Sequence, residues 1–116
     1  MAVSAEYKEF IAELCAPALG DVLIKPMFGG AGVYIGEAMF GLIAGETLYL
    51  KCDDATRAAF EQEGCKPFVF RTKGGGEATM SFWELPERLL DEPDDLPEWL
   101  LMAVEAATRA LVKRKK

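Results

Sequence analysis

The sequence contains no histidine, and its three cysteines lie far apart. Without histidine, the Ser-His-Asp and Cys-His nucleophilic arrangements are excluded, together with the most frequent general base and zinc ligand. Cys15, Cys52 and Cys65 do not have the paired spacing of a zinc site, and their odd number is not a disulfide framework. We therefore expect no catalytic activity, no metal and no cofactor, and the thiols fit a reducing cytoplasm.

Long hydrophobic runs are also missing, since no segment approaches the roughly 20 apolar residues of a membrane span. The first 13 residues carry Glu6, Glu9 and Glu13 among apolar residues, so we do not expect a signal peptide. The 116 residues suit one domain, and their composition, 51% hydrophobic and 28% charged, is typical of a soluble globular protein.

Charge is unevenly distributed along the chain, whose net charge is −6. The last four residues, Lys113 to Lys116, are all basic, so the remainder is more acidic than the net charge indicates and would repel DNA over most of its surface. The segment from Glu84 to Glu98 contains seven carboxylates and only Arg88 to offset them. This acidic segment has two interpretations, a solvated surface or a docking face for a basic partner.

Hydrophobic periodicity predicts a first helix and then a β meander. Ser4 is a suitable N-cap for a helix whose apolar stripe is Tyr7, Phe10, Ile11 and Leu14. Short β-rich runs at 33–35, 38–44 and 47–51 are separated by Gly-Glu pairs, which is typical of hairpins. Residues 22–24 form either a short connecting strand or a buried linker.

The middle run, 38–44, is apolar on both faces of the predicted strand. Alternation places Met39, Gly41 and Ile43 on one face and Phe40 and Leu42 on the other. A strand of this kind is covered on both sides, by helices, by another layer or by a second subunit. This pattern is our reason to expect a homodimer.

The second half adds a helix, a hairpin and a final helix. Asp53 is predicted to cap the second helix and Gly64 to end it, and Gly74 to Gly76 form the tip of a hairpin between strands near 68–71 and 80–83. Asp95 and Glu98 predict a capping box for a last helix with a long apolar stripe. The stripe is Trp99, Leu100, Ala103, Ala106, Ala107, Ala110 and Leu111.

The order α-β-β-β-α-β-β-α predicts an α+β domain with a five-stranded, largely antiparallel sheet and flanking helices. We expect residues 1–112 to form this single domain and residues 113–116 to be a disordered basic tail.

Two glycine- or cysteine-based motifs are better explained by structure than by chemistry. Gly30-Ala31-Gly32 lacks the third glycine of a dinucleotide fingerprint, since Ile35 occupies that position, so we interpret these glycines as a sharp entry into the sheet. Cys52 precedes a helix, whose dipole favours a thiolate, but Asp53 and the next aspartate oppose that charge. We therefore favour a structural cysteine.

Nucleic-acid binding is the alternative function that the basic residues suggest. Tyr49 and Lys51 are predicted to project from the same strand face, where an aromatic ring and a cation would contact a base or a phosphate. We favour a scattered set of surface cations around a core tyrosine, because the body is acidic. The candidate nucleic-acid contacts are Lys51, Arg57, Arg71, Lys73, Lys113 and Arg114, with Lys66 as a further member of the basic patch.

Several motifs, in the same order, resemble the TfoX (Sxy) N-terminal domain family of bacteria. The resemblance begins at 27–34, MFGGAGVY, continues through LYLK at 48–51, and ends with FWELP at 82–86. It covers roughly residues 5 to 110. The matched motif residues, to which no role is assigned, include Met27, Phe28, Gly29, Gly30, Gly32, Tyr34, Tyr49, Lys51, Arg57 and Trp83.

The resemblance implies an α+β domain without a catalytic activity or cofactor. The family is named after regulators of natural competence, which act with a global transcription regulator and typically carry a second, helical C-terminal domain. That second domain is not part of these 116 residues. From the resemblance we expect a regulatory domain that acts by protein contact, linked to transcription or competence.

Overall fold

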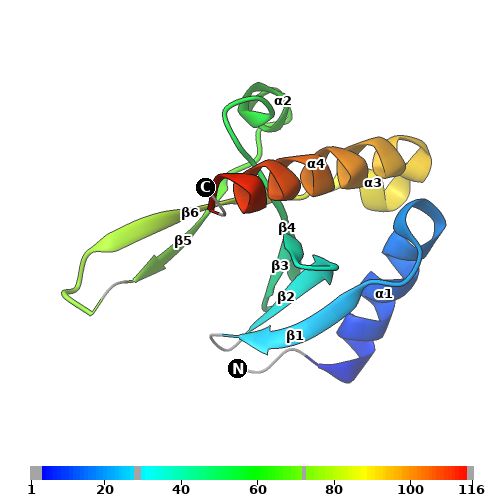
Figure 1. Ribbon diagram of the computed structural model, residues 1–116, viewed down its shortest axis with the longest axis horizontal. Coiled ribbons are helices and arrows are strands. Elements are labelled where there is room, and N and C mark those ends of the chain that lie inside the picture. The colour runs from blue at the N-terminus through cyan, green and yellow to red at the C-terminus, as the bar shows by residue number, and fades with distance from the viewer. Residues whose placement is uncertain (1–3, 28–29, 72, 115–116) are drawn as a thin grey trace.

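The computed structural model describes residues 4–27, 30–71 and 73–114, and its architecture is the predicted α+β class (Figure 1). Its strands form one antiparallel sheet in the order β1-β2-β3-β4-β6-β5. The strands are β1 (Leu23–Met27), β2 (Gly30–Ile35), β3 (Ala38–Ala44), β4 (Thr47–Lys51), β5 (Pro67–Arg71) and β6 (Glu77–Glu84). The helices are α1 (Ala5–Leu19), α2 (Arg57–Gln62), α3 (Arg88–Asp91) and α4 (Leu96–Arg114), with the 3₁₀ helix η1 at Pro93–Asp95.

Strand β1 is the sixth strand, one more than the five that we predicted. The segment that the sequence left open as a strand or a linker pairs with β2, from Leu23 opposite Tyr34 to Met27 opposite Gly30. Pro26 is tolerated here because β1 is an edge strand, where a residue without an N–H group breaks no ladder on the outer side.

The meander and the hairpin are confirmed, and glycine occupies their turns. Gly36 and Gly45, at the two meander turns, have φ values of 58° and 62°. Gly75, between β5 and β6, has a φ of 86°. Residues with side chains rarely adopt this left-handed backbone. The β5–β6 hairpin projects away from the body of the molecule (Figure 1).

A β-bulge in β3 corrects the predicted alternation of its side chains. Val33 pairs with Gly41, but the next residue, Tyr34, pairs with Met39, so Phe40 is the extra residue of β3. Because the bulge shifts the alternation, Phe40 and Ile43 both belong to the main hydrophobic core, although we had placed them on opposite faces. Both are fully buried.

The main core lies between the sheet and the helices α1 and α4. Helix α4 packs on β3 and β4 and also contacts α1 (Figure 1). Its predicted apolar stripe supplies Leu100, Ala103 and Ala107, all of them buried. Alanine has a short side chain, so these positions let the helix axis lie close to the strands.

Helix α1 has the predicted N-cap, but its buried face differs from the predicted apolar stripe. The Tyr7 N–H donates to the Ser4 Oγ at 3.1 Å, which confirms the N-cap. Ile11 is buried, but Phe10 is 44% exposed, and Cys15 takes the buried position instead. The helix continues through Pro17 and ends at Gly20.

The last helix begins and ends differently from the prediction. It is preceded by η1, and the Asp95 carboxylate accepts a hydrogen bond from Arg88 Nη1 at 3.2 Å, where we had predicted a capping box with Glu98. At the other end, α4 includes Lys113 and Arg114, which we had assigned to a disordered tail. In the described part of the chain, none of the helices is long and apolar enough to cross a membrane.

The sheet face opposite the main core is also apolar, as predicted. Leu42 and Phe82 are only 4% and 5% exposed, yet neither belongs to the main core. Across the strands, Leu42 pairs with Gly32 and Tyr49. We call this second surface the lysine–aromatic face, because it also carries Lys25, Met27, Tyr34, Met39, Lys51 and Phe68.

We predict that Gly30→Ala destabilises the protein by about 1–3 kcal/mol, because an added Cβ would collide with the Ile43 carbonyl oxygen of β3. The free energy of unfolding from urea denaturation measures the effect. Gly74→Ala is the control, since no atom lies within 4 Å of its added Cβ, and it should change stability by less than about 0.5 kcal/mol. Equal stability of the two variants would contradict the packing that we describe.

Candidate functional site: an acidic pocket between helices and sheet

A pocket of about 540 Å³ opens between α1, the β3–β4 turn, the end of α2 and the β6–α3 segment. Its volume lies in the range of small-ligand sites. Part of its lining is apolar and comes from α1, β4 and the residues that follow β6. These residues are Ile11, Leu14, Leu48, Leu85 and Pro86.

Acidic side chains make up most of the charged lining of this pocket. Glu46, Glu63, Glu84 and Glu87 line it, and Arg88 is the basic residue among the lining residues. Glu84 and Glu87 belong to the acidic segment that we singled out in the sequence, whereas Glu46 and Glu63 come from other segments. The fold therefore gathers carboxylates from distant parts of the chain.

Arg88 is held by two carboxylates and does not neutralise the whole pocket. Its Nε and Nη2 donate to Glu63 Oε1 and Oε2 at 2.9 and 2.8 Å, and its Nη1 donates to Asp95. The hydrogen bonds from Arg88 lower the pKa of Glu63, and those to Glu63 and Asp95 raise the pKa of Arg88. Among the side chains that the structure describes, no ion pair involves Glu46 or Glu87.

Two further titratable groups line the pocket and stay protonated at neutral pH. Burial, and secondarily the Glu46 carboxylate, raises the pKa of the Tyr7 phenol. Burial, Glu84 and Glu63 raise the pKa of the Cys65 thiol to about 11. A thiol in this environment is a poor nucleophile, because the thiolate is the reactive form.

Cys52 also has the environment of a structural thiol. It is 2% exposed, and its Sγ lies 3.6 Å from the Asp53 carbonyl oxygen, to which it donates. Burial is the largest cause that raises the pKa of this thiol. Within the described residues, no group of three or more histidine, cysteine or acidic side chains is arranged to hold a metal ion.

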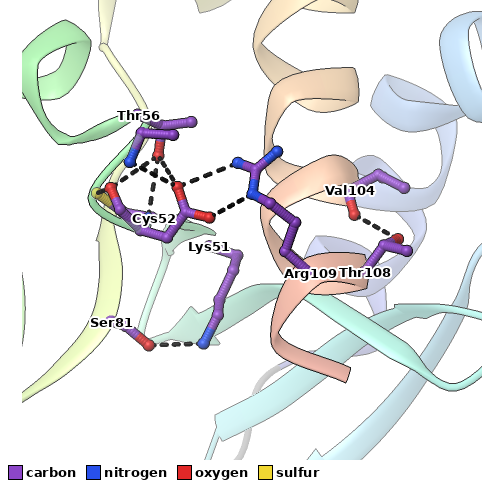
Figure 2. A network of polar contacts seen from close by, with 9 residues as sticks. Lys51, Cys52, Thr56, Ser81, Val104, Thr108 and Arg109 are labelled. Carbon is purple, nitrogen blue, oxygen red and sulfur yellow. Dashed lines mark hydrogen bonds and ion pairs between the residues drawn. The ribbon is translucent and has the colours of Figure 1, made fainter. Parts of the chain in front are cut away.

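Asp53 connects the end of β4 to α4 through an ion pair with Arg109, whose side chain is labelled in Figure 2. Its Oδ1 accepts from the Ala55 N–H at 3.1 Å, and its carbonyl oxygen accepts from the Arg57 N–H at 2.9 Å. Arg109 Nε and Nη2 donate to its two carboxylate oxygens at 2.7 and 3.1 Å. Asp53 thus organises a turn before α2, which begins at Arg57, and is not the direct helix cap that we predicted. Gly64, with a φ of 76°, follows the C-cap of α2 as expected.

The predicted nucleic-acid contacts come from four parts of the fold, which are β4, α2, the β5–β6 hairpin and the end of α4. Lys51 Nζ donates to Ser81 Oγ at 2.6 Å (Figure 2), while Arg57 pairs with Asp54 at 2.7 Å. Lys73 is exposed near the hairpin tip, and Arg71 is in β5. Lys113 and Arg114 are in the last turn of α4.

Four of the described motif residues lie on the lysine–aromatic face, namely Met27, Tyr34, Tyr49 and Lys51. Tyr49 and Lys51 share this face, as the alternation predicted, because the alternate β4 residues Leu48 and Leu50 point into the main core. Lys25 Nζ lies 5.1 Å from the Tyr34 ring centroid, and Lys51 Nζ lies 5.1 Å from that of Phe82.

The remaining motif residues have structural roles or are not described. A Cβ at Gly32 would lie 3.0 Å from the Met27 Sδ, so this glycine makes room for the side chains that pack over it. Trp83 packs against Phe60, with ring centroids 6.2 Å apart. Phe28 and Gly29 lie outside the described residues.

Sequence reasoning missed Arg109 and the pocket residues Tyr7, Glu46 and Glu63. Nothing in their local sequence distinguishes them from surface residues of an amphipathic helix or a turn. Their partners are far away in the chain, as with Arg109 and Asp53, which are 56 residues apart.

Comparison with known proteins identifies relatives of the chain. A family model described as the TfoX N-terminal domain matches residues 13–107. A DNA transformation protein, TfoX1 of Aliivibrio fischeri (strain ATCC 700601 / ES114), is 31% identical over 87 residues. The alignment covers 75% of this chain and 41% of that relative, so the chain spans less than half the length of the curated relative that it matches.

We predict that Asp53→Asn destabilises the protein by about 1–2 kcal/mol at neutral pH, because it weakens both the turn and the contact with α4. Hydrogen bonding from Arg109 lowers the pKa of Asp53, so its contribution is present above the ordinary aspartate pKa and is lost as the pH falls through the lowered value. Urea denaturation at pH 7 and at acidic pH measures both effects.

Asp54→Asn is the matched control for this measurement. Its pair with Arg57 is largely exposed, so stability should change by less than about 0.5 kcal/mol. If the two asparagine variants are equally stable at pH 7, Asp53 does not connect the turn to α4 as we infer.

Proposed function

This chain belongs to the TfoX N-terminal domain family, and we propose that it is a non-enzymatic regulatory domain that serves DNA transformation through protein contacts. The name of the curated relative, a DNA transformation protein, supports the process. The acidic pocket supports the mode of action, and it is the observation on which this proposal depends. We expect the domain to act in the cytoplasm.

The pocket suits a basic segment of a partner protein. The apolar part of its lining offers burial to hydrophobic side chains or to the methylene stems of lysine and arginine. Its carboxylates offer charge complementarity, and those of Glu46 and Glu87 are exposed and not used in ion pairs with described side chains. The neighbouring acidic segment, Glu84 to Glu98, extends this negative surface.

The chemistry of the chain supports a non-enzymatic role. Histidine is absent from the sequence, and burial raises the pKa of the Cys15 thiol to about 11, as it raises that of the other two thiols. A cysteine nucleophile without a neighbouring base and with a raised pKa reacts slowly.

A pull-down with charge variants tests this proposal. The chain is the bait in a nuclease-treated lysate of the native bacterium, and Glu46→Gln/Glu87→Gln is compared with Glu9→Gln/Glu105→Gln. All four residues are exposed, and the control pair does not line the pocket. We expect the pocket variant to lose most of the captured partner, by about three- to tenfold, while the control retains it.

Capture that disappears with nuclease, or that is equal in both double variants, would contradict protein contact at this pocket. Size-exclusion chromatography with light scattering on the same bait gives its molar mass. That measurement tests the expected homodimer independently.

A second candidate function is binding of single-stranded nucleic acid at the lysine–aromatic face. The specific observation in its favour is that Lys25 lies beside the Tyr34 ring and Lys51 shares a sheet face with Tyr49. Both tyrosines are partly exposed on an open antiparallel sheet, a combination that suits phosphate contact and base stacking. The net charge of −6 opposes it. Contacts of Lys25 and Lys51 with phosphates would make any binding weaker as the salt concentration rises.

Fluorescence anisotropy with a labelled single-stranded DNA at low and at physiological salt tests this candidate. If it holds, the unaltered chain binds at low salt and Lys25→Ala/Lys51→Ala weakens binding by about tenfold. Lys8→Ala, which removes one positive charge outside this face, is the control for the single variants Lys25→Ala and Lys51→Ala. No binding at low salt rules the candidate out.

A further inference from the structure

We propose that the acidic pocket recognises arginine, and that it receives a guanidinium group presented by a basic, partly apolar segment of a partner protein. This inference rests on the proposed function and adds to it the chemical group that the pocket selects. The guanidinium group would lie near Glu46 and Glu87, and the methylene stem of the same arginine would lie on the apolar part of the pocket lining.

The shape and lining of the pocket favour a long amphipathic side chain. Its volume of about 540 Å³ exceeds the space of one small ion and accommodates a side chain with part of its backbone. Leu14 and Leu85, which are partly exposed, provide apolar surface. A compact inorganic cation would leave this surface in contact with water, whereas an arginine stem would cover it.

The distribution of the carboxylates favours guanidinium over ammonium. Acidic side chains approach the pocket from the β3–β4 turn, the end of α2 and the β6–α3 segment. A planar group with five N–H donors can serve carboxylates in several directions, and it is more weakly hydrated than an ammonium group. Its transfer to a partly apolar pocket therefore costs less.

The wall of the pocket already contains one example of this recognition. Arg88 donates to both oxygens of Glu63 and also to Asp95, so one guanidinium bridges carboxylates of two different segments. Glu46 and Glu87 remain without an ion pair to any described side chain. A second guanidinium, from a partner, would provide the N–H donors that these two carboxylates lack in the described structure.

Tyr7 provides a local signal for occupation of the pocket. It lines the pocket, and part of the increase in its pKa comes from the Glu46 carboxylate. A guanidinium bound beside Glu46 would offset that negative charge, so the pKa of Tyr7 should be lower with an arginine side chain bound than with its neutral analogue, which would bury Tyr7 equally. Binding elsewhere on the acidic surface would leave the pKa of Tyr7 nearly unchanged.

The test uses three blocked peptides in which leucine alternates with arginine, with lysine or with the neutral arginine analogue citrulline. Affinity is measured by isothermal titration calorimetry, and the pKa of Tyr7 is followed by NMR of labelled tyrosine, assigned with Tyr7→Phe. We expect the arginine peptide to bind about three- to tenfold more tightly than the lysine peptide and tightest overall, with the citrulline peptide weakest.

The charge variants locate the binding. Glu46→Gln/Glu87→Gln should weaken binding of the arginine peptide by about three- to tenfold and remove the difference in the pKa of Tyr7 between the arginine and citrulline peptides. Glu9→Gln/Glu105→Gln should leave both unchanged. Circular dichroism and thermal melting establish that both double variants are folded.

The outcomes distinguish this inference from the proposed function. If lysine and arginine peptides bind equally and both respond to the pocket variant, the selection of arginine is wrong while docking of a basic segment stands. If the arginine peptide binds equally to both double variants, the pocket is not its site and the inference is wrong. Failure of all three peptides overturns the inference, and the pull-down then decides the proposed function by itself.

Discussion

Packing of α4 on the central strands is the contact on which the rest of the structure depends. Leu100, Ala103 and Ala107 are buried against β3 and β4, where the bulged Phe40 also enters the core. The short alanine side chains keep the helix close to the sheet, so it has little freedom to slide. With α4 in this place, Arg109 lies within hydrogen-bonding distance of Asp53, and the turn before α2 is positioned by a helix more than 50 residues away.

The N-terminal end of α4 is also connected to the segment that lines the pocket. Helix α4 is preceded by η1 and α3, and Arg88 in α3 holds Glu63 at the end of α2 and Asp95 in η1. These ion pairs are exposed and contribute little to stability individually. Their main effect is structural, because they fix α3, the end of α2 and η1 relative to one another beside the pocket. The walls of the pocket thus come from parts of the chain that cannot form it alone.

The pocket and the lysine–aromatic face carry different charged groups, a difference that the net charge of the chain does not reveal. Carboxylates gather at the pocket and along the adjacent acidic segment, whereas Lys25 and Lys51 lie beside aromatic rings on the sheet face without the long helices. Carboxylates beside apolar surface and lysines beside aromatic rings favour different partners. The proposed protein contact uses the pocket, and the alternative candidate, nucleic-acid binding, uses the lysine–aromatic face.

The sequence by itself determined the class of the fold and the position of most elements. Their signals are local: Ser4 at the start of α1, the Gly-Glu turns of the meander, Gly64 after α2 and the stripe of α4. It also determined the family, because the ordered motifs from Met27 to Pro86 match it. For the sites, it indicated that Tyr49 and Lys51 share a face and that the segment from Glu84 is acidic.

Only the tertiary structure decided which distant residues meet. The alternation of β3 did not reveal the bulge at Phe40, since a bulge depends on pairing with β2. Asp53 suited a helix cap by its local sequence, but its carboxylate also binds Arg109, whose approach depends on the packing of α4. The pocket was hidden for the same reason. Side-chain periodicity specifies which face of an element is apolar, but long-range packing sets which elements lie together, so the gathering of Tyr7, Glu46 and Glu63 followed from the fold alone.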